Sequence, residues 1–454
     1  MAIISQNPAT EEILKTFTSL TSDEVDQKIA LSKSAFMSWK KLGFAERSKY
    51  MIKLCDTLHA KKDIWAKFAS LEMGTPFVQA KTEIEKCAFM AGIFAYRSEE
   101  MLVSQKVDIK AIDSYISFEP LGTLLHVAPW NYPFYLALRP VIPAIMAGNT
   151  VLLKHASNVP QVALAIQDIF DEAGFPDGVF QTLLISASEV EKIIQSPVVS
   201  VITVIGSEKA GSAVASSAGK YLKKTILELG GNDPMIVLAD ANIDDAIAGA
   251  VQSRLRNCGQ SCNASKRYVV DKAVIDDFVG KLKIAYEKQV IGDPFESTTD
   301  IGPLATKNSL EEIEAQIADA INLGAKIITG GKRIGSAGYF FTPTIITRVT
   351  KKMRVYNEEV FGPVATVIEV DNFLEAIDVA NDSEFGLGAS IWTTNYELAR
   401  SMIPQIEAGN VYVNSIVRGD PKLPFGGVKK SGYGREFGEY GIKEFVNIKS
   451  VVIK

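Results

Sequence analysis

Three short segments carry residues that could together perform nucleophilic chemistry. Residues 257–262 (Asn-Cys-Gly-Gln-Ser-Cys) follow a helix predicted at 243–256, and their glycine and small polar residues favour an accessible loop thiol at Cys262. Glu228 ends an apolar run, precedes two glycines, and could activate water. Asn131 lies between a predicted strand and a predicted helix and could donate to an oxyanion. Taken alone, Cys262 is better explained as a buried inert thiol, and the alternatives for Glu228 and Asn131 are a surface acid and a helix cap.

The order and spacing of these segments resemble the aldehyde dehydrogenase family. Glu-Leu-Gly-Gly starts at Glu228 and Gly-Gln-Ser-Cys ends at Cys262, 34 residues later (262 − 228). Further motifs of the family occur in the same order and extend the resemblance over essentially the whole chain, at 7–10, 129–133, 358–363, 424–427 and 431–436.

The resemblance implies a role for each of the three residues. Cys262 is the nucleophile, whose thiolate attacks an aldehyde and later carries a thioester. Asn131 and the backbone N–H of Cys262 stabilise the oxyanion. Glu228 is the general base for the water that releases the acid, which favours hydrolysis over acyl transfer to coenzyme A. We expect Cys258 to be a small buried residue; the alternative is a regulatory disulfide with Cys262 or a cofactor adduct.

Two other classes of function fit the sequence less well. A non-catalytic protein on the same fold would have no reason to keep Cys262, Glu228 and Asn131 together. A cysteine hydrolase needs a histidine base, and none of the 3 histidines lies in a segment that resembles one. With so few histidines, we expect no metal site.

A nucleotide-binding turn is predicted at Gly206 and Ser207, where a predicted strand ends and a helix begins. A helix N-terminus offers free N–H groups to a phosphate, although a serine there is more often only a cap. By resemblance, Lys154 contacts the adenosine ribose. Ser157 replaces a glutamate found in many NAD-using members, and a serine beside a lysine can accept a 2′-phosphate. The sequence thus predicts NADP as the preferred cofactor; the alternative is that Ser157 tolerates NADP and NAD alike.

The resemblance also implies residues for the nicotinamide end of the cofactor. Glu359 is expected to hold the nicotinamide ribose, with Phe361 against the ring region. Trp130, next to Asn131, is assigned to the same site. The alternative for Glu359 is a solvated surface acid.

Two arginines indicate the substrate. Arg139 lies eight residues after Asn131, about two helical turns on, and Arg256 lies six residues before Cys262. Both positions resemble the carboxylate-binding arginines of succinate-semialdehyde dehydrogenases, and two cations near the thiol would select an aldehyde with a distal carboxylate. Either arginine alone is more often a structural ion-pair partner.

One loop departs from that resemblance. Those enzymes have a serine before Pro-Phe-Gly-Gly, whereas this chain has Val-Arg-Gly-Asp-Pro-Lys at 417–422. Gly419 could leave room for a longer substrate, and Asp420 could neutralise a nearby arginine. Succinate semialdehyde is the predicted substrate, while glutarate semialdehyde or a mixed set of aldehydes stays open.

The elements that must position these residues follow an α/β pattern from Leu121 onward. Apolar runs alternate with helical segments, which predicts parallel sheets covered by helices on both faces, including a Rossmann-like one. Strands are predicted at 122–128, 150–154, 179–185, 201–205, 235–238, 266–270 and 361–370, and helices at 23–41, 45–60, 133–146, 159–173, 207–219 and 243–256.

We expect three parts in the chain. A cofactor-binding domain spans 1–97 and 121–229, and a catalytic domain spans 230–430. An oligomerisation element combines 98–120, with a hairpin predicted from strands at 107–112 and 115–119, and 431–454, with a strand at 446–453. Such isolated strands suggest pairing with another subunit, an ordinary edge strand being the alternative. The resemblance implies a homodimer or homotetramer.

Composition excludes several partners. The net charge is −5, with acidic and basic residues mixed along the chain, so neither nucleic acid nor a membrane surface is an expected partner. No apolar run is long enough to span a membrane, and no signal peptide is visible. Four cysteines are too few for a disulfide scaffold, which favours the cytoplasm. The expected partner is a small-molecule aldehyde.

Overall fold

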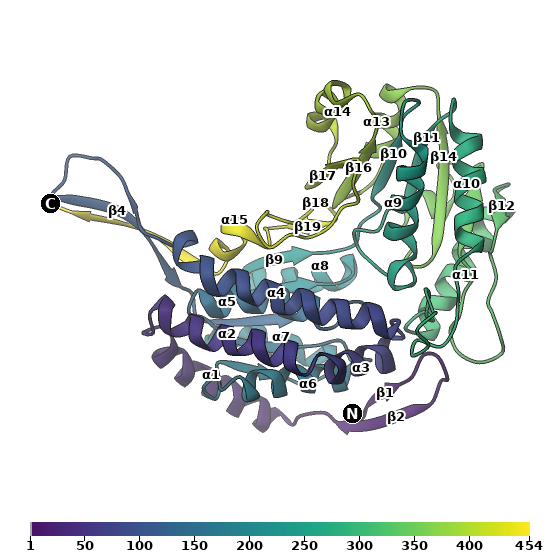
Figure 1. The fold of residues 1–454 in the computed structure, drawn as a ribbon. Coiled ribbons are helices and arrows are strands. Elements are labelled where there is room, and N and C mark those ends of the chain that lie inside the picture. The colour runs from purple at the N-terminus through teal and green to yellow at the C-terminus, as the bar shows by residue number, and fades with distance from the viewer. Residues whose placement is uncertain (1) are drawn as a thin grey trace.

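A six-stranded sheet forms the centre of the first half of the molecule (Figure 1). The computed structural model describes residues 2–454, so Met1, at the start of the predicted cofactor-binding domain, lies outside the described residues. The sheet order is β19-β9-β8-β5-β6-β7, with only β19 antiparallel to its neighbour. The strands are β5 (Thr123–Val127), β6 (Thr150–Lys154), β7 (Phe180–Thr182), β8 (Val199–Ile205), β9 (Lys224–Glu228) and β19 (Gly432–Tyr433).

Helices cover both faces of this sheet, as the alternating pattern predicted. The crossover helices are α5 (Tyr135–Met146), α6 (Pro160–Glu172), α7 (Val190–Gln195) and α8 (Glu208–Lys220). A layer of earlier helices adds to them: α1 (Ser22–Trp39), α2 (Phe44–Ala60), α3 (Lys62–Met73) and α4 (Phe77–Met101). One large apolar core joins these layers, and Trp39 donates from its indole N–H to the Ile145 carbonyl at 3.0 Å. The hairpin of β1 (Ala2–Gln6) and β2 (Ile13–Thr18) precedes the helices.

A second, seven-stranded sheet has the order β12-β13-β14-β11-β10-β16-β17. Only β12 is antiparallel to its neighbour. Its strands are β10 (Pro234–Val237), β11 (Arg267–Asp271), β12 (Lys326–Thr329), β13 (Thr344–Thr347), β14 (Val364–Val370), β16 (Gly388–Trp392) and β17 (Asn410–Val413). The helices around it are α9 (Ile243–Leu255), α10 (Ile275–Glu287), α11 (Lys307–Asn322), α12 (Arg354–Asn357), α13 (Phe373–Asn381) and α14 (Tyr396–Met402). The α/β class predicted from the sequence is confirmed.

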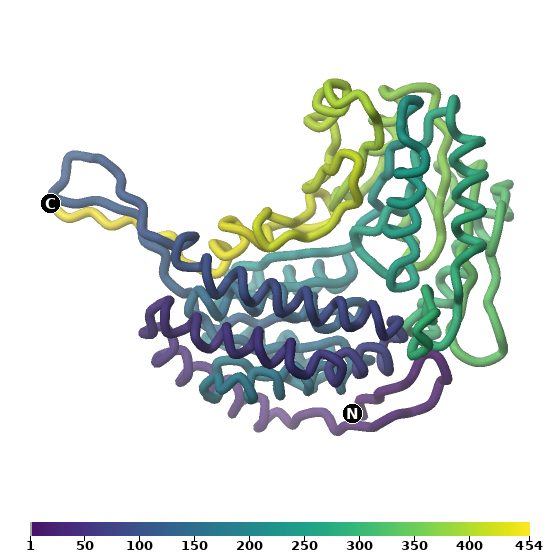
Figure 2. Tube along the Cα trace, in the orientation of Figure 1, coloured from purple at the N-terminus to yellow at the C-terminus, as the bar shows by residue number. Residues whose placement is uncertain are grey.

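A three-stranded sheet projects from the body as an arm (Figure 2). Its order is β20-β4-β3, with β3 at Gln105–Lys106, β4 at Asp113–Pro120 and β20 at Val446–Ile453. The hairpin prediction was wrong in its first strand. Residues 107–112 form a loop because their apolar side chains have no sheet to pack on; Ile112 is 80% exposed. Residues 98–101 belong to α4, and β19 lies in the six-stranded sheet rather than in this arm.

The carboxyl ends of the parallel strands bring distant segments together. Glu228 ends β9, residues 129–131 follow β5, and Gly206 follows β8, all at one edge of the six-stranded sheet. Ligand sites of open parallel sheets form at this edge. Within residues 2–454, no helix has both the length and the apolar character needed to cross a membrane.

Candidate active site

Cys262 lies where two cavities meet. The larger cavity has a volume of about 770 Å³ and the smaller about 230 Å³, and Cys262 lines both. The larger cavity collects most of the residues predicted from the sequence: Trp130, Asn131, Gly206, Ser207, Glu228, Glu359 and Phe361. The smaller cavity contains Arg139 and Arg256. Lys154 and Ser157 line neither cavity; they lie at the end of β6, beside the β5 end that leads to Trp130.

The backbone before Cys262 is left-handed at three consecutive residues. Asn257, Cys258 and Gly259 have φ values of 54°, 53° and 72°, so the chain reverses directly after α9. A Cβ at Gly259 would lie 2.2 Å from the Gly362 carbonyl oxygen, which restricts this position to glycine. The buried Asn257 amide donates to the Asn131 carbonyl at 2.5 Å. The turn therefore ties the thiol loop to the segment that carries Asn131.

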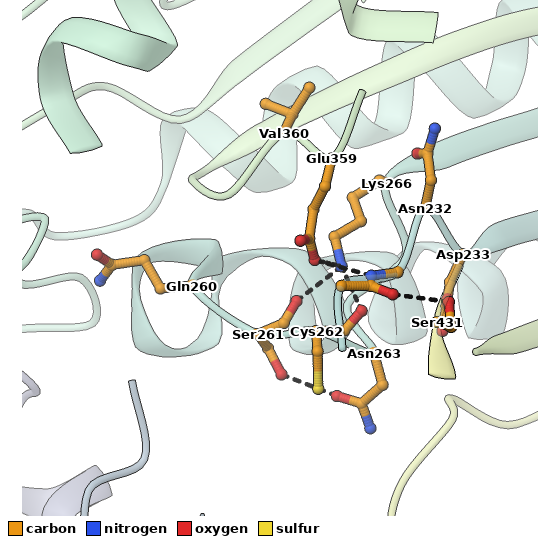
Figure 3. A network of polar contacts seen from close by, with 12 residues as sticks. Asn232, Asp233, Gln260, Ser261, Cys262, Asn263, Lys266, Glu359, Val360 and Ser431 are labelled. Carbon is orange, nitrogen blue, oxygen red and sulfur yellow. Dashed lines mark hydrogen bonds and ion pairs between the residues drawn. The ribbon is translucent and has the colours of Figure 1, made fainter. Parts of the chain in front are cut away.

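A buried lysine clamps the loop on its other side. The Lys266 ammonium is 1% exposed and donates to the Ser261 carbonyl at 2.8 Å and to the Cys262 carbonyl. It also forms an ion pair with Glu359 Oε1 at 3.1 Å. In Figure 3 the Cys262 sulfur points away from this ammonium, which contacts the backbone of the loop. Lys266 thus fixes the loop and leaves the thiol free.

The glycines after Glu228 permit close approach to the same loop. A Cβ at Gly231 would lie 2.5 Å from the Cys262 carbonyl oxygen, and a Cβ at Gly230 would lie 2.5 Å from Glu359 Oε2. The Gly231 N–H donates to Glu359 Oε1 at 3.1 Å. A side chain at Gly230 would displace the Glu359 carboxylate, and one at Gly231 would displace the Cys262 loop.

Glu228 belongs to a buried charge triad. Arg139 Nη2 lies 3.2 Å from Glu228 Oε2 and also pairs with Glu436. Burial, and after it the Glu436 carboxylate, raise the pKa of Glu228 above its ordinary value. Burial acts to lower the pKa of Arg139, but the carboxylates of Glu436 and Glu228 outweigh it and raise that pKa. The other Glu228 oxygen, Oε1, is buried without a hydrogen-bond partner within residues 2–454, so it is available to a water molecule.

This triad changes the interpretation of Arg139. The sequence predicted it as a ligand of the substrate carboxylate, yet its guanidinium already serves two protein carboxylates and packs on the rings of Phe425 and Phe437. An arginine whose single positive charge is already paired with two protein carboxylates attracts a further anion less strongly. The structure therefore favours Arg139 as the residue that positions Glu228.

The environment of the thiol raises its pKa. Burial and the Glu228 carboxylate raise the pKa of Cys262 to about 12, while the charges of Arg139 and Lys266 act in the opposite direction. Asn131 is buried and uses one N–H of its amide on the Gln260 carbonyl, at 3.0 Å. Cys258 is 1% exposed, and burial raises its pKa to about 12. Both cysteines are free thiols, and the placement of Cys258 supports its interpretation as a small buried residue.

The larger cavity fits a dinucleotide by its residues. Helix α8 begins beside it, with Ser207 as the N-cap, whose hydroxyl accepts from the Ala210 N–H at 3.3 Å. The indole of Trp130 and the ring of Phe361 meet edge to face at 5.7 Å and form a wall. Free N–H groups at one end and flat apolar surfaces at the other suit a phosphate and a nicotinamide ring. Ser157, three residues after the end of β6, is exposed.

The smaller cavity is lined by more cations than the sequence suggested. Lys86 and Arg418 line it together with Arg139 and Arg256. Gly419 does not leave a void: a Cβ there would lie 2.8 Å from the Phe437 ring and 3.2 Å from the Tyr135 hydroxyl.

Asp420 does not act as predicted either. Its carboxylate accepts the Lys422 N–H at 2.9 Å, and within residues 2–454 no ion pair joins it to an arginine. The expectation that it neutralises a nearby arginine was therefore wrong. In the described part of the chain, no group of three His, Cys, Asp or Glu side chains is arranged to hold a metal ion.

Several contributors to the site were missed in the sequence. Lys266 stands at the start of a correctly predicted strand, and Glu436 stands in a quoted motif, but neither was given a role. Lys86 lies on an amphipathic helix, where a lysine normally faces solvent. A charge buried between distant segments looks like a surface charge in a single sequence. Only the Glu436 motif offered a signal that could have been used.

Known proteins resemble the chain over its whole length. A model of the aldehyde dehydrogenase family matches residues 2–451. A Synechocystis sp. protein named probable succinate-semialdehyde dehydrogenase (NADP(+)) is 47% identical over 453 residues, covering 100% of both chains. A Mycobacterium bovis protein named succinate-semialdehyde dehydrogenase (NADP(+)) 1 is 46% identical over 456 residues, also covering 100% of both. The solved structure of succinic semialdehyde dehydrogenase from Streptococcus pyogenes in complex with NADP+ has a TM-score of 0.97 at 36% identity, covering 99% of both chains.

Replacing Lys266 tests whether the clamp positions the thiol. Lys266→Met leaves the Ser261 and Cys262 carbonyls and the Glu359 carboxylate without their common donor, so we expect kcat to fall at least about tenfold, since a lost buried charged hydrogen bond costs roughly 1.5–3 kcal/mol. The control is Lys272→Met, which removes an exposed pair with Asp371 and should change kcat less than about twofold. Equal kcat in the two variants, measured by cofactor reduction at saturating substrate, would show that the clamp is dispensable.

Proposed function

Because the chain belongs to the aldehyde dehydrogenase family, we propose that it oxidises succinate semialdehyde to succinate with NADP as the hydride acceptor. The observation that carries the proposal is the position of Cys262 between a cavity suited to a dinucleotide and a second, cationic cavity. The names of the similar proteins of Synechocystis and Mycobacterium bovis, both NADP(+) enzymes, support the substrate and the cofactor.

The roles proposed for the chain's residues follow from this arrangement. Cys262 attacks the aldehyde carbon as a thiolate, which the nearby charges of Arg139 and Lys266 favour. Asn131 and the Cys262 backbone N–H donate to the oxyanion, each such donor contributing roughly 3–4 kcal/mol in a dry site. The bound cofactor would accept the hydride that converts the thiohemiacetal to a thioester. Glu228 then removes a proton from the water that attacks the thioester, using its unpartnered Oε1.

The cofactor residues keep the roles that the sequence suggested. Gly206 and Ser207 at the start of α8 would hold the pyrophosphate, and Glu359 and Phe361 would contact the nicotinamide half. Lys154 and Ser157 would hold the adenosine ribose and its 2′-phosphate. Ser157 brings no negative charge to this position, which supports NADP.

The arm formed by β3, β4 and β20 supports a homo-oligomer. It projects from the body (Figure 1), and it exposes apolar side chains, with Ile448 60% and Ile112 80% exposed. A monomer rarely exposes such a surface, so a partner subunit is proposed to cover it. Whether the assembly is a dimer or a tetramer stays a prediction, and a cytoplasmic location is proposed from the free thiols.

Initial rates of cofactor reduction, followed by absorbance, test the substrate and cofactor proposals together. We expect kcat/KM for succinate semialdehyde to exceed that for butyraldehyde at least about a hundredfold, because a site built for a carboxylate loses a charged contact without it. NADP should give a higher kcat/KM than NAD. A preference for butyraldehyde would leave only a general aldehyde dehydrogenase.

Replacing Glu228 tests its role as the base for hydrolysis. Its raised pKa means that turnover of the wild-type enzyme should fall as the pH drops through a value well above the ordinary glutamate range, because only the carboxylate can accept a proton. Glu228→Gln should lose this limb of the pH profile and turn over about a hundredfold or more slower. It should also alkylate faster at Cys262 with iodoacetamide, since burial still raises the thiol pKa but the added effect of the Glu228 charge is gone. Full steady-state turnover in Glu228→Gln would exclude the proposed role.

A further inference from the structure

Three cations in the smaller cavity come from separate parts of the fold. Lys86 lies on α4, Arg256 follows α9, and Arg418 lies in the loop between β17 and β18 (Val428–Lys429). Helix α4 belongs to the helix layer of the six-stranded sheet, whereas α9 and β17 belong to the seven-stranded sheet (Figure 1). The fold brings these three residues, which are far apart in the sequence, to one small cavity.

In the described part of the chain, the three cations have neither an ion-pair partner nor a side-chain hydrogen bond. Within residues 2–454, no hydrogen bond or ion pair of 4.0 Å or less involves the side chain of Lys86, Arg256 or Arg418. Arg139, in the same cavity, is instead neutralised by Glu228 and Glu436. Within residues 2–454, the cavity therefore holds three cations without an ion-pair partner beside one arginine that has two.

One carboxylate, Glu83, lines the cavity with these cations and offsets only part of their charge. Its Oε1 accepts the N–H groups of Phe134 and Tyr135, both at 2.8 Å, and so serves the start of α5. Burial raises the pKa of Glu83 to about 7, so it is only partly ionised at neutral pH. The net charge of the cavity is positive.

The three cations line the same cavity and influence one another. Partial removal from water, and after it the charge of Arg256, lower the pKa of Lys86 to about 8; Glu83 acts against this shift, and Arg418 adds to it. Like charges brought together are unfavourable, and an anion bound between them would relieve the repulsion.

We propose that Lys86 and Arg418 are specificity-determining residues that bind the distal carboxylate of the substrate together with Arg256. The inference rests on the proposed function and goes beyond it, because no motif singled out Lys86 or Arg418. A guanidinium can bind both oxygens of a carboxylate, and an ammonium adds a point charge at the cavity mouth. The serine that succinate-semialdehyde dehydrogenases have in this loop is absent here. In the proposal, Arg418, next to Gly419, binds the substrate carboxylate in its place.

Substrate competition in charge variants tests this assignment. Lys86→Gln, Arg418→Gln and the double variant are compared with wild type, using kcat/KM for succinate semialdehyde divided by kcat/KM for butyraldehyde. Because both side chains are exposed, which weakens each charged contact, we expect this ratio to fall about threefold to tenfold in each single variant and at least about tenfold in the double variant. The loss should lie in KM for succinate semialdehyde rather than in kcat. The charge-retaining pair Lys86→Arg and Arg418→Lys should keep most of the ratio.

The control is Arg97→Gln, on the same helix as Lys86 but paired with Glu100 and outside the cavity, which should leave the ratio at the wild-type value. If wild type prefers succinate semialdehyde and the double variant keeps the wild-type ratio, Lys86 and Arg418 are not carboxylate ligands and the proposed function stands. If wild type itself shows no preference, both the substrate proposal and this inference are overturned.

Discussion

The geometry of the site depends on the contacts of the buried Lys266 ammonium. Because it holds the Ser261 and Cys262 carbonyls and the Glu359 carboxylate at once, it fixes the thiol loop against the segment that walls the larger cavity. The loop can approach β9 only because Gly230 and Gly231 have no side chains. A buried ammonium is costly to keep unless its charge is paired, and this one is fully engaged. Its two carbonyl contacts and its ion pair with Glu359 offset the free-energy cost of burying it, and the same contacts position Cys262.

Charge is distributed unequally among the cations of the smaller cavity. Arg139 forms ion pairs with Glu228 and Glu436, so it is proposed to orient Glu228 rather than to attract the substrate's carboxylate. In the part of the chain that the structure describes, Lys86, Arg256 and Arg418, which line the same cavity, have no ion-pair partner. An acidic aldehyde entering the smaller cavity would therefore be drawn by its far end while its carbonyl reaches the thiol.

The sequence predicts elements well where local pattern and packing agree. The strands at 150–154 and 446–453 were predicted with their exact bounds, because each apolar or alternating run stops abruptly at both ends. The strand expected at 107–112 fails for the opposite reason: its apolar residues are exposed in a loop, so the pattern did not report burial. The family resemblance placed Cys262, Glu228 and Asn131 at one cavity. It could not show that Arg139 is occupied by two acids or that Lys86 reaches the cavity, since both depend on contacts between segments far apart in the chain.

In the proposed mechanism, Cys262 carries the acyl group and Glu228 releases it. Intact-protein mass spectrometry of Glu228→Gln, quenched with acid after mixing with NADP and succinate semialdehyde, detects this acyl group directly. We expect a mass increase of one succinyl group, localised to the peptide that contains Cys262 and absent in Cys262→Ser. An unmodified Cys262 at the end of a turnover that has reduced one equivalent of NADP would contradict the mechanism.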